Sequence, residues 1–215
     1  KMKQYIDNLH QRVSSMGIDV EPYITQSNGG VMSISSTVET PVQTALSGPS
    51  AGVVGAIYVA ESAGFNNLIT YDMGGTSTDV SLVMNGTPEY TTKRKVCGLP
   101  SGIPMIDVHA VGAGGGSIAH LDNAGALKVG PESAGADPGP AAYGLGGENP
   151  VVTDANIVLG RINPTHFLGG RMTIHADLAR KVISEKLASP MNMTVEQAAS
   201  GIISVVNSNM ARALR

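Results

Sequence analysis

Apolar residues recur at helical spacing near both ends of the chain. Residues 4–16, 174–187 and 194–214 each place apolar side chains three or four positions apart, which predicts three helices. Thr194 and Gln197 have the spacing of a capping box at the start of the last helix. The apolar stripe of the first helix comprises Tyr5, Ile6, Leu9, Val13 and Met16, and that of the last comprises Ala198, Ile202, Val205 and Met210.

The middle of the chain is typical of strands joined by tight turns. Residues 68–71 predict a buried strand, and residues 79–84 alternate between apolar and polar positions, which predicts a second strand. Asn85-Gly86 is a strong hairpin signal because both residues tolerate a positive φ, and residues 87–96 are expected to return as a third antiparallel strand. Earlier, residues 53–60 are small and apolar on nearly every side, which predicts a buried helix with a glycine-rich N-terminus.

Composition narrows the class of protein. The 215 residues include 27 glycines, which cluster in a few loops, and the net charge of −3 provides no basic face for a nucleic acid. No apolar run approaches the ~20 residues that span a bilayer, and the one cysteine excludes an internal disulfide framework. We therefore expect a soluble, cytoplasmic α/β protein that is part of a longer polypeptide, with neither nucleic acid nor membrane as a partner.

The segment of residues 72–79 carries the clearest candidate chemistry. Without side chains at Gly74 and Gly75, the main-chain N–H groups of residues 74–76 can approach an anion and converge on it. Asp72, at the end of a strand, is suited to hold Mg²⁺ through water beside a phosphate. A ligand-free glycine turn is the alternative. The expected phosphate-binding set is Asp72, Gly74, Gly75, Thr76, Ser77, Thr78 and Asp79.

A second anion site is expected at the start of the helix that follows residue 47. Unpaired N–H groups and the helix dipole favour negative charge there. Tight helix packing through Gly52, Gly55 and Ala56 explains the small residues equally well. The candidate anion-binding residues are Ser47, Gly48, Ser50 and Gly52.

Asp107 and His109 are the candidates for acid–base or metal chemistry. Two residues apart on a strand, they would share one face just before the glycine loop of residues 112–117. A purely structural role is the alternative. His120 and Asp122 are weaker candidates, and Cys97 is expected to be a small buried hydrophobic residue.

The pattern Asp-x-Gly-Gly-Thr-x-x-Asp on a hairpin resembles the phosphate motifs of the actin, hexokinase and Hsp70-like ATPases. Further stretches resemble the hydantoinase A and 5-oxoprolinase family over almost the whole chain. The motifs lie at residues 26–30, 47–56, 71–80, 107–117, 129–140, 153–156 and 209–212.

This resemblance implies a fold, a cofactor and a class of reaction. The fold would be an actin/hexokinase-like (ribonuclease H-like) α/β lobe with antiparallel hairpins at the phosphate site. Residues 1–215 would form part of one nucleotide-binding domain, with a glycine- and proline-rich insert at about residues 97–150. The cofactors would be ATP and Mg²⁺, and the loop at Asp72 would be the second phosphate hairpin.

The activity implied is ATP-dependent opening of a cyclic amide such as a hydantoin or 5-oxoproline, through phosphoryl transfer to the amide oxygen. The alternatives are activation of a ketone, as in acetone-carboxylase-type subunits, and a non-catalytic lobe that senses nucleotide. The partners implied are a hydantoinase B-like subunit or domain and further copies in an oligomer. The family's first phosphate hairpin and last nucleotide loop do not occur in these residues, so we expect the chain alone to be inactive.

Overall fold

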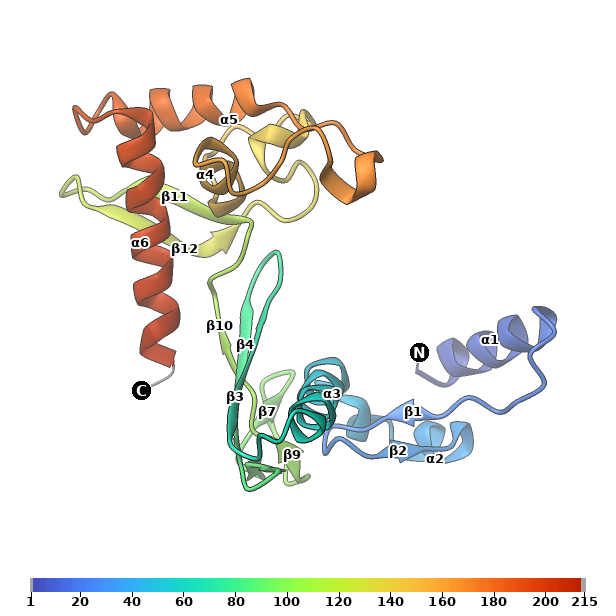
Figure 1. Ribbon diagram of the computed structural model, residues 1–215. Helices are drawn as coiled ribbons and strands as arrows, with labels where there is room; N and C mark the ends of the chain where they lie inside the picture. Colours follow the sequence, from blue (N-terminus) through green and yellow to red (C-terminus); the bar gives the residue numbers. More distant parts are fainter. Residues whose placement is uncertain (1, 214–215) are drawn as a thin grey trace. The chain divides into compact units, whose positions relative to one another are not determined.

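The computed structural model describes residues 2–213 (Figure 1). The chain divides into two compact units, the first formed by Lys1–Tyr71 with Val80–His109 and the second by Asp72–Asp79 with Ala110–Arg215. The glycine- and proline-rich segment expected at residues 97–150 is therefore divided between the two units. That this chain is part of one nucleotide-binding domain stays a prediction.

The described part of the first unit contains four helices and a set of small antiparallel strand pairs. Its helices are α1 (Met2–Ser15), α2 (Ile34–Glu39), the 3-10 helix η1 (Pro41–Thr44) and α3 (Ser47–Ser62). Its paired strands are β1 (Ile24–Thr25) with β2 (Val31–Met32), β6 (Tyr90–Thr91) with β9 (Met105–Ile106), and β7 (Lys95–Val96) with β8 (Leu99–Pro100).

A four-stranded sheet contains the strands that lead into and out of the glycine hairpin. Its order is β10-β4-β3, with β5 paired to β4. Asn85 and Gly86 connect β4 to β5 with φ values of 53° and 72°, so the hairpin predicted from this dipeptide is confirmed. The third strand is shorter than expected. The burial expected for residues 68–71 is wrong, because β3 is mostly exposed, with Ile69 53% accessible. The strands are β3 (Leu68–Met73), β4 (Thr78–Met84), β5 (Thr87–Pro88) and β10 (His109–Val111).

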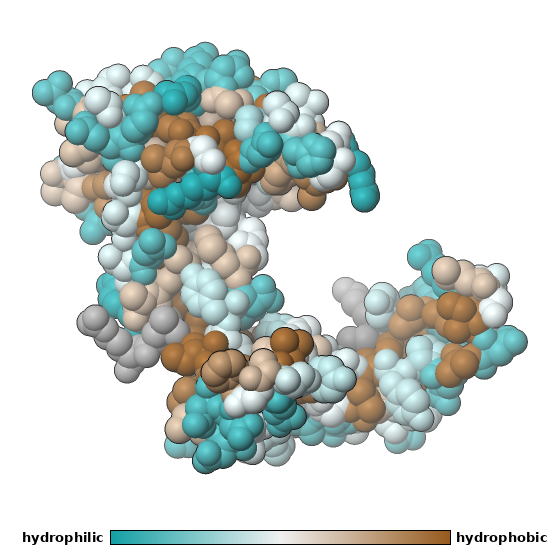
Figure 2. Space-filling model, viewed as in Figure 1, coloured by the Kyte–Doolittle hydropathy of each residue, from teal (hydrophilic) through white to brown (hydrophobic). Residues whose placement is uncertain are grey.

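Helix α3 forms where the sequence predicts it, but it is much less buried than expected. Only Ser50 and Val53 are fully buried, and Val53 packs with Val83, Ile106 and Val108 in a small core. Apolar side chains elsewhere on the helix are exposed, with Val59 67% accessible; Figure 2 shows apolar surface in brown on this part of the molecule.

Cys97 is exposed, so its expected burial is wrong. It forms the two-residue turn between β7 and β8 together with Gly98, with φ values of 51° and 81°. A turn at the end of an isolated hairpin has no core to bury its side chain.

The second unit packs three helices against one antiparallel pair of strands. The pair is β11 (Ser117–Leu121) with β12 (Leu127–Ser133). The helical elements are η2 (Ala141–Tyr143), α4 (Val152–Val158), η3 (Phe167–Gly170), α5 (Ala176–Ile183), the π-helical turn η4 (Ser184–Ala188) and α6 (Val195–Ala213).

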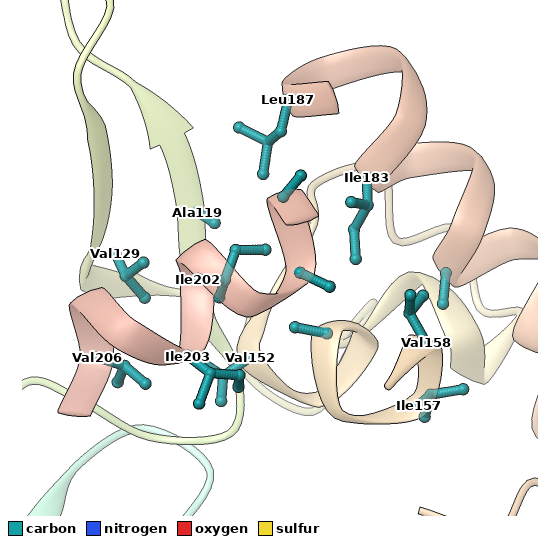
Figure 3. Packing of buried hydrophobic residues seen from close by; sticks show 14 of the residues in the cluster. Ala119, Val129, Val152, Ile157, Val158, Ile183, Leu187, Ile202, Ile203 and Val206 are labelled. Carbon is teal, nitrogen blue, oxygen red and sulfur yellow. The ribbon is translucent and has the colours of Figure 1, made fainter. Parts of the chain in front are cut away.

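The core of the second unit lies between α6, α4, α5 and the strand pair (Figure 3). Ile202 and Val206 on α6 belong to the same cluster as Val129 on β12, and Ile183 on α5 points toward Val158 on α4. These helices and strands therefore share one apolar interior, and interiors of this kind are close-packed.

The predicted start of α6 is confirmed in atomic detail. Thr194 N–H donates to Gln197 Oε1 at 2.9 Å, and Gln197 N–H donates to Thr194 Oγ1 at 3.2 Å. This reciprocal pair is a capping box. Of the expected stripe, Ala198, Ile202 and Met210 are buried and Val205 is partly buried.

No helix among residues 2–213 combines the length and apolarity needed to cross a bilayer. The mixed α/β fold with antiparallel sheets expected from the sequence is confirmed.

Candidate functional site

The glycine hairpin is the turn between β3 and β4. Its ends are joined by a hydrogen bond of 2.8 Å from the Gly74 N–H group to the Ser77 carbonyl oxygen. Residues 72–76 are exposed and Ser77 is partly buried. The second unit therefore leaves the tip of this turn accessible.

Three consecutive N–H groups at the tip are available to a ligand. In the described part of the chain, the N–H groups of Gly75, Thr76 and Ser77 have no hydrogen-bond acceptor. The Gly74 N–H group, which the sequence expectation included, is not available because it closes the turn. The amides that remain lie one residue further along than expected, at positions 75–77.

Gly75 is a glycine that this chain itself does not require. Its φ is not positive, and a Cβ atom built there meets no atom of the described chain within 4 Å. Glycine is normally needed for a left-handed backbone or for a close neighbour, and neither applies here. Nothing in the described chain therefore explains why position 75 lacks a side chain.

The polar side chains around the turn differ in their availability. Asp72 and Thr76 are exposed, while Asp79 is partly buried and already makes an interaction. Thr78 corrects an expectation: its side chain is fully buried, and its hydroxyl donates to the Ala113 carbonyl oxygen at 2.6 Å. Hydroxyl donors to a phosphate can therefore come from Thr76 and Ser77, but not from Thr78.

The glycine loop of residues 112–117 lies directly against the hairpin within the second unit. Gly115 N–H donates to the Gly74 carbonyl oxygen at 3.0 Å, and Gly116 N–H donates to the Gly75 carbonyl oxygen at 2.6 Å. The Gly114 N–H group donates to Ser117 Oγ at 2.8 Å. None of the three amides is left for a ligand, so this loop contacts the hairpin instead of forming a second anion site.

Thr153, at the start of α4, holds the glycine loop in place. Both its N–H group and its hydroxyl donate to the Gly115 carbonyl oxygen, at 2.8 and 2.9 Å. The sequence analysis includes Thr153 only as part of a family motif. The motif does not reveal that the partner of Thr153 is Gly115, 38 residues earlier in the chain.

Asp154, the next residue, is fully buried and accepts three main-chain hydrogen bonds. The donors are the N–H groups of Ala142 at 2.9 Å, Val151 at 3.1 Å and Ala141 at 3.2 Å. Burial raises the pKa of the Asp154 carboxyl, while the three N–H groups act in the opposite direction. This carboxylate joins α4 to the glycine- and proline-rich segment that precedes it.

The second expected anion site, at the start of α3, is only partly available. The Ser50 hydroxyl is buried and donates to the carbonyl oxygens of Ser27 and Leu46, at 2.8 and 3.0 Å. Ser47 is partly buried, whereas Gly48 and Gly52 are exposed. A Cβ atom at Gly52 or Gly55 meets nothing within 4 Å in the described chain, so tight helix packing inside this chain does not explain these glycines.

Asp107 and His109 lie in the first unit, and both are exposed. Asp107 precedes β10 and lies outside any strand, so the shared strand face expected for the pair does not form as predicted. Arg94 Nη2 lies 3.0 Å from Asp107 Oδ1, and the same group also donates to the Val108 carbonyl oxygen. A catalytic role for the pair stays a prediction.

Asp122 has a structural role in the turn between β11 and β12. Its Oδ1 accepts from the N–H groups of Ala124 and Ala126, both at 2.9 Å, and Lys128 lies 3.7 Å from Oδ2. The Ala126 N–H group lowers the pKa of the Asp122 carboxyl, with smaller contributions in the same direction from Ala124 and Lys128. His120 is exposed on β11. Residues 2–213 contain no group of three or more His, Cys, Asp or Glu side chains that could hold a metal ion.

Two solved structures to which this chain is similar are those of ATP-dependent enzymes. The chain aligns with a nucleotide-free structure of acetone carboxylase, solved for the mechanism of ATP-dependent acetone carboxylation, with a TM-score of 0.87 and 32% identity over 99% of this chain and 30% of that one. It aligns with the crystal structure of ATP-dependent caprolactamase from Pseudomonas jessenii with a TM-score of 0.82 and 40% identity, over 100% of this chain and 31% of that one. These likenesses are consistent with an actin-like ATPase lobe.

The chain belongs to the hydantoinase/oxoprolinase family, whose model matches residues 1–215. It is 41% identical over 214 residues to the caprolactamase subunit alpha of Pseudomonas jessenii. That match covers 100% of this chain and 31% of the relative, so the chain spans about a third of the relative's length. The family resemblance inferred from the motifs is confirmed.

Proposed function

We propose that this chain is the part of an ATP-dependent cyclic amide hydrolase that holds the terminal phosphates of ATP. The observation that carries the proposal is the hairpin tip, where the N–H groups of Gly75, Thr76 and Ser77 have no acceptor within the described chain. In addition, no contact within the described chain requires glycine at position 75. Consecutive free N–H groups in an open turn are suited to phosphate oxygens.

Four residues of the hairpin, Asp72, Gly75, Thr76 and Ser77, have proposed roles. The N–H groups of Gly75 and Thr76 hold phosphate oxygens, and the hydroxyls of Thr76 and Ser77 add donors beside them. The exposed carboxylate of Asp72 holds Mg²⁺ through water, which offsets the repulsion between carboxylate and phosphate. When bound, ATP would supply a phosphoryl group to the amide oxygen, which makes the ring carbonyl easier to attack.

The cyclic amide as substrate is supported by the family and by its relatives. The family is described as hydantoinase/oxoprolinase, and a relative that is 41% identical is a caprolactamase subunit. Hydantoins, oxoproline and caprolactam are all rings closed by an amide. The finer choice of ring belongs to residues outside this chain.

Activation of a ketone is the second candidate. It is supported by the likeness to acetone carboxylase, with a TM-score of 0.87 and 32% identity, beside 0.82 and 40% for caprolactamase. Both reactions would use the same hairpin, because each begins with transfer of phosphate to an oxygen atom. A non-catalytic lobe that senses nucleotide is the third possibility.

The test is an assay of ADP release by the protein at the full length of its relatives, together with a partner subunit. The acetone carboxylase and caprolactamase relatives are named as subunits, which supports such a partner, and we propose a hydantoinase B-like chain and an oligomeric assembly. Stimulation by hydantoins, 5-oxoproline or caprolactam supports the amide hydrolase, and stimulation by acetone alone supports the ketone reaction. Release that none of these compounds stimulates would contradict both and favour the sensing lobe.

Two variants connect that activity to the hairpin. Asp72→Ala and Gly75→Val are each expected to abolish ATP turnover while the protein stays folded, because both positions are exposed. Normal turnover in both variants would remove the hairpin from the mechanism. Cytoplasmic location and the roles of Asp107 and His109 stay predictions, as does the anion site at Ser47, Gly48 and Gly52.

A further inference from the structure

We propose that the glycine loop of residues 114–116 is a positioning device that sets the direction of the phosphate-binding N–H groups. This inference rests on the proposed function of the hairpin and extends it to three residues that do not touch the ligand. It follows from the hydrogen bonds between the loop and the hairpin, all of which lie within the second unit.

The direction of a free N–H group follows from its own peptide plane. In a trans peptide the carbonyl and the N–H group point to opposite sides. The Gly74 carbonyl is bound by Gly115 N–H, so the Gly75 N–H group of the same peptide points away from the loop. The Gly75 carbonyl is bound by Gly116 N–H, so the Thr76 N–H group also points away from the loop.

The two bonds therefore orient two successive amides to the same side. Gly75 and Thr76 are exposed, so that side is open in the second unit. Without the loop, each peptide plane of a glycine turn could rotate, because glycine accepts a wide range of φ and ψ. Fixing both planes in advance removes the cost of ordering them when phosphate binds.

The main chain of the loop lies so close to the main chain of the hairpin that the loop requires glycine. A Cβ atom at Gly114 would lie 2.7 Å from the Thr76 carbonyl carbon and 2.8 Å from both the Gly74 carbonyl oxygen and the Gly75 carbonyl carbon. All three are main-chain atoms of the hairpin, so the hairpin itself would have to move. The φ of Gly114 is not positive, which leaves this steric contact as the reason for glycine.

Glycine is also required at positions 116 and 115, but less strictly than at position 114. A Cβ atom at Gly116 would lie 3.0 Å from the Gly75 carbonyl oxygen and 2.9 Å from Ser133 Oγ. At Gly115 it would meet Thr153 Oγ1 at 2.9 Å, while the nearest hairpin atom is the Gly74 carbonyl oxygen at 3.9 Å. Substitution by alanine is therefore expected to disturb the hairpin most at Gly114, less at Gly116 and least at Gly115.

The experiment measures how much each added phosphate contributes to binding. AMP, ADP and Mg-ATP are titrated by calorimetry into the protein at the full length of its relatives, as wild type and as Gly114→Ala. The variant is expected to bind ADP and ATP roughly 10- to 150-fold more weakly, the range for loss of one hydrogen bond to a charged group. Its affinity for AMP is expected to be unchanged.

Two controls separate positioning from general loss of stability. Gly102→Ala changes a glycine in the first unit that has open space and no positive φ, and it should leave all three affinities unchanged. Ile202→Val removes one methylene from the core of the second unit, and it should lower the unfolding temperature without a selective loss of ADP binding. Gly116→Ala provides the same measurement if Gly114→Ala fails to fold.

The outcomes distinguish the inference from the proposed function. Wild-type ADP affinity in both loop variants would overturn the positioning role, even where Gly75→Ala weakens ADP binding. A wild-type protein that binds AMP as tightly as ADP would instead overturn the phosphate site itself. Loss of ADP affinity in Gly114→Ala with AMP affinity intact supports both.

Discussion

Asp154→Asn tests the buried carboxylate that supports the start of α4. The substitution keeps the size of the side chain and one oxygen acceptor, but it replaces the other oxygen with an N–H₂ donor. Since Oδ2 accepts from Ala141 and Val151 while Oδ1 accepts from Ala142, the better placement of Asn leaves its amide facing the Ala142 N–H group. One buried donor then loses its acceptor.

The expected cost is about 1–3 kcal/mol, the penalty for one buried polar group left unsatisfied. Opening of the segment around Ala142 should therefore become about 5- to 150-fold more frequent, because 1.4 kcal/mol corresponds to a factor of about ten. Asp154→Ala would remove the acceptor of all three N–H groups. Because that loss is several times larger, the asparagine variant is the more informative one.

The assay is hydrogen exchange in the native protein, read by mass spectrometry on fragments that contain Ala142 and Val151. Asp177→Asn is the matched control, because it makes the same chemical change at an exposed site in the first turn of α5. Its exchange should stay within a factor of about two of wild type, as for most surface substitutions. Equal protection of Ala142 in wild type and Asp154→Asn would refute the reasoning.

Two further predictions concern other polar groups of the second unit. Thr78→Val should lower the free energy of unfolding by about 1–3 kcal/mol, because the buried Ala113 carbonyl loses its donor. Thr76→Val at the exposed tip should lower it by less than about 0.5 kcal/mol, and equal unfolding temperatures of the two variants would contradict this prediction. The Ala126 N–H group lowers the pKa of Asp122 in the folded protein. Asp122 therefore stabilises the fold at pH values above 3.8, its ordinary pKa, and this contribution is lost as the pH falls through the lowered pKa of the folded state. The difference in unfolding temperature between wild type and Asp122→Asn should therefore shrink on acidification from pH 6 toward pH 3, and a constant difference would contradict the role of the carboxylate.

Local patterns in the sequence predict much of the fold. Helix α1, the capping box of α6 and the Asn85-Gly86 hairpin follow from periodicity and turn chemistry within a few residues. The glycine hairpin of residues 72–79 is found in the same way. Each of these features is decided by neighbours in the chain.

What could not be predicted depends on contacts between distant segments. The bond from Gly115 to Gly74 and the bond from Thr153 to Gly115 each connect residues about forty positions apart, and no local pattern specifies them. Thr78 is a partial exception, because it shares the strand parity of the buried Val80, so extending the predicted strand by one residue would have turned it inward. Helix α3 is more exposed than its apolar sequence predicts, since few residues of the described chain cover it.

Hydrogen exchange at single-residue resolution across residues 72–79 tests the central claim most directly. In the protein at the full length of its relatives, without nucleotide, the N–H groups of Gly75 and Thr76 should exchange rapidly, because they are exposed and have no acceptor in the described chain. Saturating Mg-ATP or Mg-ADP should slow both of them, and saturating AMP should not. Unchanged exchange of both amides at saturating Mg-ATP would contradict the account.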